Sequence, residues 1–139
     1  MRVLALDLGS KRIGVAVSDR SGTIATPLTV VTRSGRREDD HRRIAAMVAE
    51  EGAERVIVGL PLSLDGSLGP AAKAAVAEAE ALAEVLAVPV ESFDERLTTV
   101  TADRALMEAR MRGEARRRVV DKVAAAVMLQ AWLDRRAIR

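Results

Sequence analysis

The segment that most restricts the fold is VLALDL at residues 3–8. Alternate side chains of a β-strand point to opposite faces, and here both alternate sets are apolar except at Asp7. A strand with two apolar faces is typical of the middle of a sheet that is covered on both sides. The sequence therefore predicts a layered α/β domain with this strand at its centre and Asp7 near the strand's carboxyl end.

The other elements are predicted by turn signals and by a change in the apolar period. A Gly-Ser-Lys turn precedes residues 13–18, which predict a hairpin with the first strand. Residues 23–32 predict a third strand, and Pro27 favours an irregular or edge position for it. Further along, the apolar spacing becomes helical. The later predicted elements are a helix at 42–51, a strand at 55–59, a helix at 70–86, a strand at 88–93, and helices at 98–111 and 117–135.

This β-β-β-α-β-α-β-α-α order predicts one α/β domain that spans residues 1–139. The first three strands should form an antiparallel meander, and the two strands that follow helices should pair in parallel. The expected architecture has three layers, with a mixed five-stranded sheet between helices. No repeat or linker divides the chain, and its length suits a single core.

The composition excludes several classes of chemistry. The chain has no cysteine and one histidine, so disulfide scaffolds, thiolate zinc sites, thiol nucleophiles and serine triads are all disfavoured. His41 lies among charged residues, and we expect it in a solvated segment without a catalytic role. Phe93 and Trp132 are the only aromatic residues, which argues against stacking of bases and makes Trp132 a core anchor. No segment suits a bilayer or a secretory signal, so we expect a soluble, cytoplasmic protein.

Acidic side chains follow apolar segments at three places. Asp7 ends the central strand, and Asp94 and Glu95 follow the strand at 88–93. Open α/β sheets commonly have their ligand-binding sites at the carboxyl ends of strands. Alternation puts Asp94 and Glu95 on opposite faces, so only one of them should point at a site. On a helix, Asp121 has only apolar neighbours on its own face, namely Ala124, Ala125, Met128 and Trp132.

Each of these acids also has a structural interpretation. Asp7 could pair with Lys11 or Arg12. The two acids at 94 and 95 could cap the helix that follows them. Asp121 could pair with Arg117 or Arg118. The loop at 60–69, which precedes a helix, is open between a phosphate-binding turn and a plain capping turn.

Three carboxylates without histidine or cysteine suit a hard divalent cation, Mg²⁺ or Mn²⁺, held by oxygen. Paired metal ions of this kind commonly hydrolyse phosphodiesters. The net charge of +2 hides uneven placement, because residues 33–43 and 110–118 each contain five arginines. The guanidinium fork favours phosphate. We therefore interpret both segments as loops that contact backbone phosphates with salt-dependent affinity.

Four stretches of the chain resemble the YqgF/RuvX family of RNase H-like nucleases. They are ALDLGSKRIGVAVSD at 5–19, VGLPLSLDGSLGPAA at 58–72, DERLTT at 94–99 and VDKVAAAVMLQAWLD at 120–134. The resemblance covers nearly the whole chain in the family's order. It implies the RNase H fold and assigns Asp7, Glu95 and Asp121 as catalytic, metal-binding acids. The choice of Glu95 over Asp94 rests on the resemblance alone, and a contribution from Asp94 or Asp19 stays open.

The resemblance also implies a role. Family members are associated with endonucleolytic processing at the 5′ end of precursor 16S rRNA, and resolution of four-way DNA junctions is the alternative. A non-catalytic RNA- or ribosome-associated factor is the alternative from another class. The expected partners are nucleic acid, either precursor rRNA or branched DNA, and ribosomal particles, with no membrane and no prediction of oligomeric state. The expected substrate-binding residues are Lys11, Arg12, Arg96, Arg116, Arg117 and Arg118.

Overall fold

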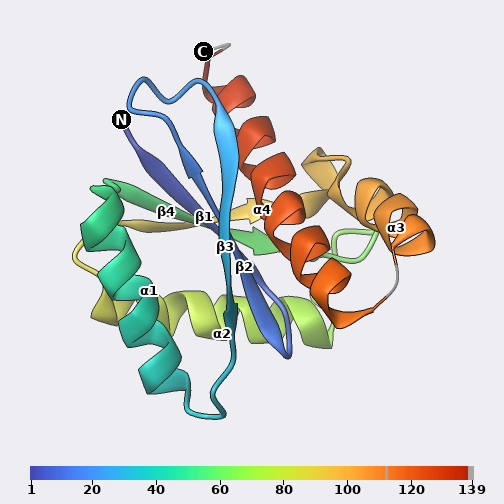
Figure 1. The fold of residues 1–139 in the computed structure, drawn as a ribbon, viewed down its shortest axis with the longest axis horizontal. Helices are drawn as coiled ribbons and strands as arrows, with labels where there is room; N and C mark the ends of the chain where they lie inside the picture. The colour runs from blue at the N-terminus through green and yellow to red at the C-terminus, as the bar shows by residue number, and fades with distance from the viewer. Residues whose placement is uncertain (112, 138–139) are drawn as a thin grey trace.

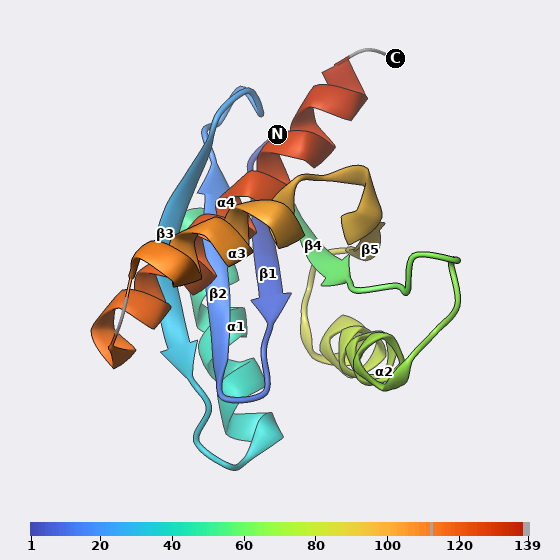
Figure 2. The same ribbon diagram turned by 90° about the vertical axis from the view of Figure 1, so that its right-hand side faces the viewer.

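The computed structural model of the chain describes residues 1–111 and 113–137 (Figure 1). Its sheet has the strand order β3-β2-β1-β4-β5 (Figure 2). The first three strands pair antiparallel, and β1, β4 and β5 pair in parallel. This confirms the predicted meander followed by parallel strands. The strands are β1 (Val3–Leu8), β2 (Arg12–Ser18), β3 (Ala25–Thr32), β4 (Arg55–Leu60) and β5 (Val90–Asp94).

The central position of β1 is also confirmed, because residues 3–6 have no exposed surface. The third strand lies at the edge of the sheet, as Pro27 indicated. Pro27 stands opposite Ala16, next to a shift in register between Val15 and Ala16. A proline has no N–H for a ladder hydrogen bond, so an irregular edge strand accommodates it without loss.

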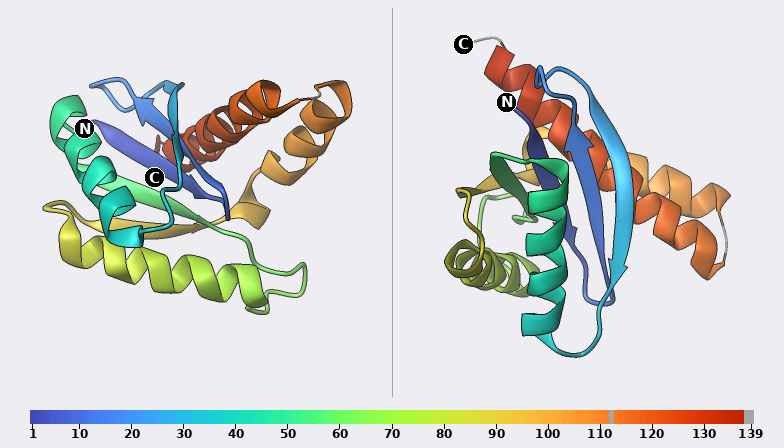
Figure 3. Two further views of the ribbon diagram at one scale, coloured as in Figure 1. Left: turned by 60° about the horizontal axis from the view of Figure 1, so that its bottom comes forward. Right: turned by 60° about the vertical axis from the view of Figure 1, so that its left-hand side comes forward.

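Helices cover both faces of the sheet, as Figures 2 and 3 show. One apolar cluster joins α1 and α2 to residues such as Leu4 and Leu6. A second cluster joins α4 to Val3 and Ala5 on the other face, and α3 packs against α4. The helices are α1 (Arg37–Glu51), α2 (Pro70–Val85), α3 (Val100–Arg110) and α4 (Glu114–Ala137), with a 3-10 turn, η1, at Glu95–Leu97. The predicted three layers are therefore present.

Two helices begin earlier than predicted. Helix α1 starts at Arg37 rather than residue 42, because its first turn carries three acids that favour a helix N-terminus without showing an apolar period. Helix α4 starts at Glu114 rather than residue 117. The interval between the two last predicted helices, residues 112–116, is thus helical from 114, and Arg112 lies outside the described residues. Both arginine-rich segments are largely helical, so their interpretation as loops was wrong.

The expected solvent exposure of His41 was wrong as well. Its side chain is buried, and its Nε2 lies 2.8 Å from Oε2 of Glu78 in α2. Arg33 donates two hydrogen bonds to the same carboxylate, at 2.9 and 2.7 Å, and one to the Gly9 carbonyl at 2.7 Å. This buried cluster ties α1, α2 and the β1–β2 turn together. Arg33 is consequently engaged inside the protein and not available to phosphate.

Trp132 is buried in the cluster beneath α4, as expected for a core anchor. None of the helices in the described part of the chain combines the length and apolarity that a membrane span requires.

Candidate active site

Asp7 points to the face of the sheet that α4 covers. It alternates with Val3 and Ala5, which belong to the α4 cluster, and only 14% of its side chain is exposed. Its carboxylate forms an ion pair with Arg104 of α3. The pairings with Lys11 or Arg12 considered from the sequence are not those that the structure shows for this acid.

Glu95 follows β5 directly, so β4 separates it from β1. The structure bridges this gap at Gly59, near the end of β4. A Cβ atom at Gly59 would lie 3.0 Å from Oε1 of Glu95 and 2.6 Å from Sδ of Met128. Because glycine has no side chain there, Glu95 lies over β4 and shares a cavity of about 250 Å³ with Asp7 and Arg104. Sequence reasoning did not predict this role of Gly59, although a glycine near the end of a buried strand indicates a close approach.

Asp94 takes no part in this cavity. It accepts a hydrogen bond from the Arg96 backbone N–H at 2.9 Å and pairs with the Arg96 guanidinium at 2.7 Å. Arg96 also donates to the Leu64 carbonyl at 3.3 Å. Asp94 is thus the cap of η1, and Glu95 is the acid that faces Asp7.

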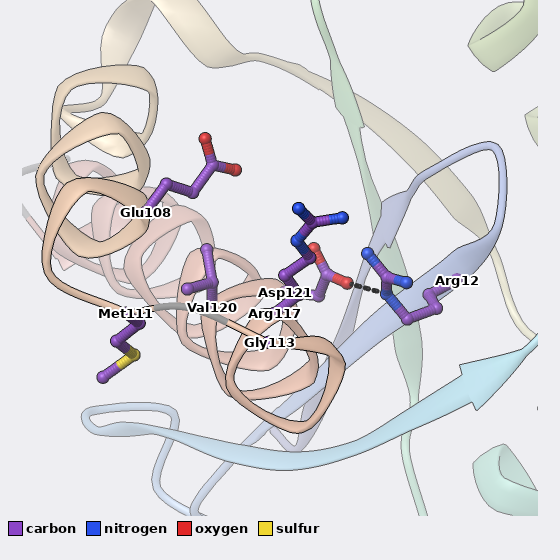
Figure 4. A pocket seen from close by; sticks show the side chains of 7 residues that line it. All are labelled: Arg12, Glu108, Met111, Gly113, Arg117, Val120 and Asp121. Carbon is purple, nitrogen blue, oxygen red and sulfur yellow. Dashed lines mark hydrogen bonds and ion pairs between the residues drawn. The ribbon is translucent and has the colours of Figure 1, made fainter.

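Asp121 reaches the same region from the opposite side, on α4. Its Oδ2 accepts a hydrogen bond from Nε of Arg12 at 2.6 Å, and its Oδ1 lies 3.6 Å from Nη1 of Arg104. Figure 4 shows the Arg12 pair at the wall of a second cavity, of about 460 Å³, which Glu108 and Arg117 also line. The pairing with Arg117 or Arg118 along the helix is not among the ion pairs of the described residues.

Gly14 of β2 brings α4 close enough for this arrangement. A Cβ atom at Gly14 would lie 2.1 Å from the backbone carbonyl oxygen of Asp121 and 3.2 Å from the backbone nitrogen of Lys122. No side chain other than hydrogen fits between this strand and this helix. The absence of a Cβ at Gly14 therefore sets the depth at which α4, and with it Asp121, lies against the sheet.

Arg104 joins the three acids, and sequence reasoning missed it. Its two terminal nitrogens meet Asp7 and Asp121, and Glu95 interacts with it electrostatically. Burial by itself lowers the pKa of Arg104, but the three carboxylates outweigh this and raise it. An arginine in an exposed, weakly apolar helix has no local signal that distinguishes it from a solvated one.

The pKa values of two of the carboxyl groups are shifted in the direction that disfavours their ionised forms. Burial raises the pKa of Asp7, against the lowering effect of Arg104, and the charge of Asp121 adds to the increase. Burial, followed by the charge of Asp7, raises the pKa of Glu95 from 4.5 to about 7. Arg104 therefore does not fully offset the burial of Asp7 and Glu95 and the repulsion between the neighbouring acids.

The donor chemistry suits a hard divalent cation, because the groups are carboxylates in partial burial with too little positive charge around them. Among residues 1–111 and 113–137, no three acidic or histidine side chains are already placed to hold one ion. The cation that lies between them is the Arg104 guanidinium. Metal binding by Asp7, Glu95 and Asp121 thus stays a prediction. It requires the three carboxylates to move closer to one another.

The basic residues predicted to bind substrate are divided by the structure. Arg12 and Arg117 line the cavity beside Asp121, Arg116 is exposed near the start of α4, and Lys11 is exposed in the β1–β2 turn. Arg96 is engaged by Asp94, as described above. Arg118 donates to the Thr32 hydroxyl of β3 at 2.6 Å.

For the loop at 60–69 and for Asp19, the observed hydrogen bonds favour a structural role. In the loop at 60–69, the Gly66 N–H bonds to the Ser63 carbonyl at 2.8 Å and the Ser67 N–H to the Asp65 carboxylate at 2.9 Å. These amides are used within the turn. Asp19 accepts hydrogen bonds from Ser21 and from the backbone of the β2–β3 turn, which lowers its pKa to about 2.

We expect Glu95→Gln to stabilise the fold at pH 8. A carboxyl whose pKa is raised on folding binds its proton more tightly in the folded state, so its ionisation costs stability as pH rises from 4.5 to about 7. Glutamine removes that cost. After discounting for solvent screening, the gain is about 1–2 kcal/mol above pH 7, and it vanishes near pH 4.

Urea denaturation at several pH values measures this gain. Asp94→Asn is the matched control, because Arg96 and the η1 backbone lower the pKa of Asp94 and its substitution should not stabilise the fold. An unchanged or reduced stability of Glu95→Gln at pH 8 would contradict the electrostatic description of the site.

Comparison with known proteins places these features in a family context. A family model described as "RuvX: Holliday junction resolvase" matches residues 1–135. A Mycobacterium sp. (strain KMS) protein named "Putative pre-16S rRNA nuclease" is 48% identical over 136 residues, which cover 97% of this chain and 80% of the relative. A Myxococcus xanthus protein of the same name is 48% identical over 96% of this chain and 88% of its own.

Among solved structures, the chain is similar to one titled "T. thermophilus RuvC in complex with Holliday junction substrate". The TM-score is 0.61 at 22% sequence identity, with 99% of this chain and 96% of the other covered. At that identity the likeness concerns the fold alone, which agrees with the predicted RNase H-like architecture.

Proposed function

This chain belongs to the RuvX family, and we propose that it is a divalent-metal-dependent endonuclease that processes the 5′ end of precursor 16S rRNA. The family and the nuclease names of its relatives support a phosphodiester hydrolase acting on nucleic acid. The 16S precursor, metal dependence, ribosomal particles as the setting and the cytoplasm as the location belong to the proposal.

One observation carries it: Asp7, Glu95 and Asp121 come from three separate elements and converge on one guanidinium. Acids are expensive to bury when their charge is only partly compensated, and such groups are common at functional sites. These three residues would hold the Mg²⁺ or Mn²⁺. When bound, the ion supplies a Lewis acid that offsets charge on the phosphate and favours deprotonation of water.

The protein's own residues account for substrate placement. Arg12 and Arg117 stand at the cavity beside Asp121, where a phosphate of the backbone can meet both. Guanidinium groups hold phosphate with two parallel hydrogen bonds, which positions the strand without reading its sequence. Arg116, Lys11 and Arg118 extend this positive surface.

The alternative within the enzyme class is resolution of four-way DNA junctions, which the family's description favours. A non-catalytic RNA- or ribosome-associated factor is the alternative outside it. The non-catalytic factor differs from the two enzymes in its demands on the acids, since only the enzymes need them ionised and close together.

A side-by-side cleavage assay tests the proposal. The substrates are a 5′ precursor-16S fragment and a four-way DNA junction at one salt concentration, with Mg²⁺, Mn²⁺ or a chelator. We expect metal-dependent cleavage of the RNA by the wild type and none by Asp7→Asn. Cleavage of the junction alone would instead favour the resolvase, and RNA binding without cleavage would favour the non-catalytic factor.

We expect Gly59→Ala to reduce kcat for the cleaved substrate by about tenfold, because the Glu95 carboxylate must move by a few tenths of an ångström and a displacement near 1 Å at a reacting group costs about a hundredfold. The new Cβ would lie 3.0 Å from Oε1 of Glu95, so the carboxylate must move, while flexible Met128 lets the fold persist. Gly69→Ala is the matched control, since its Cβ meets only Ser63 Oγ at 3.6 Å. Equal kcat for both variants would rule out the positioning role of Gly59.

A further inference from the structure

Arg104 holds a position that the proposed chemistry does not by itself explain. Its Nη2 pairs with Asp7 and its Nη1 lies 3.6 Å from Oδ1 of Asp121, while Glu95 adds to the negative field around it. The guanidinium is thus the positive charge among the three acids. A divalent cation bound there would need the same carboxylate oxygens.

Arginine and metal ion therefore compete. Two positive groups about 4 Å apart repel strongly in a partly buried site. The Asp7 oxygen that pairs with Arg104 would have to share its lone pairs between the guanidinium and an ion, which weakens both interactions. Closure of the acids around a metal is therefore favoured when the guanidinium moves away.

The helix that carries Arg104 is held loosely enough to allow such a movement. Helix α3 contains a single buried residue, Val100, at its first position, and the remainder of the helix is half-buried or exposed. Elements with few buried apolar contacts open at low free-energy cost. The side chain of Arg104 is itself 30% exposed and lines the cavity that Asp7 and Glu95 share.

We propose that Arg104 is an exchangeable counter-ion, which neutralises Asp7 and Asp121 in the free protein and yields to the divalent cation as it transfers to a nucleic-acid phosphate. The inference rests on the proposed function, since it requires a metal at the acids. A phosphate is the natural destination, because the guanidinium fork binds phosphate in two parallel hydrogen bonds as it does a carboxylate. Metal and phosphate binding then strengthen each other by the same factor.

Calorimetric titration with Mn²⁺ alone, without nucleic acid, tests the competition. We expect Arg104→Gln to bind Mn²⁺ about tenfold more tightly than the wild type, because the competing charge is gone. Arg104→Lys keeps the charge and should stay within about twofold of the wild type. Arg110→Gln removes a charge from the last turn of the same helix and should leave the Mn²⁺ affinity unchanged. Asp7→Asn should lose the binding.

A second measurement follows the wild-type protein and uses a variant only to assign one resonance. The Nε–H resonance of Arg104, assigned by its absence in Arg104→Lys, should shift during a Mg²⁺ titration with the midpoint of Mg²⁺ binding. The Arg110 resonance should not shift. An Arg104 signal that stays constant while Mg²⁺ saturates the site would overturn the proposal.

The outcomes separate this inference from the proposed function. Unchanged or weaker Mn²⁺ affinity in Arg104→Gln, with metal-dependent cleavage intact in the wild type, overturns the counter-ion role alone. In that case Arg104 holds the acids in place instead of competing for them. Absence of Mn²⁺ binding in the wild type overturns both.

Discussion

Asp7→Asn is expected to reduce cleavage by at least about a thousandfold, the order of effect seen when a group that acts within a catalytic unit is removed. Asparagine has nearly the same shape, so the loss is one of charge and of a metal-binding oxygen. The fold should persist, because burial already raises the pKa of this carboxyl and its ionisation costs stability. Cleavage rates and thermal unfolding of the purified variant measure the two effects.

The same loss is expected for Glu95→Gln and Asp121→Asn, because the three acids act together. Asp94→Asn is the matched control: Asp94 neighbours Glu95 in the sequence but is engaged by Arg96. Full activity of any of the three variants would remove that residue from the site. Loss of activity in Asp94→Asn would show that Asp94 contributes, which the sequence left open.

The second large effect concerns stability. Gly14→Ala is expected to cost about 3 kcal/mol, at the upper end of the usual range for overpacking a core. Its Cβ would lie 2.1 Å from the Asp121 carbonyl oxygen and 2.6 Å from the carbonyl carbon. These are backbone atoms that cannot rotate away, so α4 must move off β2 and carry Asp121 with it.

Urea denaturation measures the change in the free energy of unfolding. Thermal unfolding should show a fall in Tm of about 10 °C for a chain of this size. Gly69→Ala serves as the control and should cost less than about 1 kcal/mol, since its Cβ meets only ordinary contacts. Wild-type stability in Gly14→Ala would mean that the strand and helix are not in such close contact.

Local patterns predicted most of the architecture. Apolar period, turns and the position of Pro27 are readable within a few residues, and the strand order confirms the interpretation made from them. Alternation also places Asp7 on one face and separates Asp94 from Glu95. The choice between those two acids could not be made this way, because either face could have been the functional one.

The errors about burial have one physical origin. His41 and Arg33 stand among charged residues, and a run of charges usually lies in solvent. Here Glu78, far away in the sequence, pairs with both and allows their burial. A buried polar cluster looks locally like a solvated one, because the partner that satisfies it comes from another element.

The sequence by itself determined the order of elements, the covered central strand and the positions of the three acids along the chain. Only the tertiary structure decided that Arg104 pairs with Asp7, 97 residues away, and Arg12 with Asp121, 109 residues away. Likewise, Gly14 and Gly59 acquire their roles from what packs against them. Periodicity reports which face of an element is apolar, whereas charge pairing and close approach depend on which elements the packing brings together.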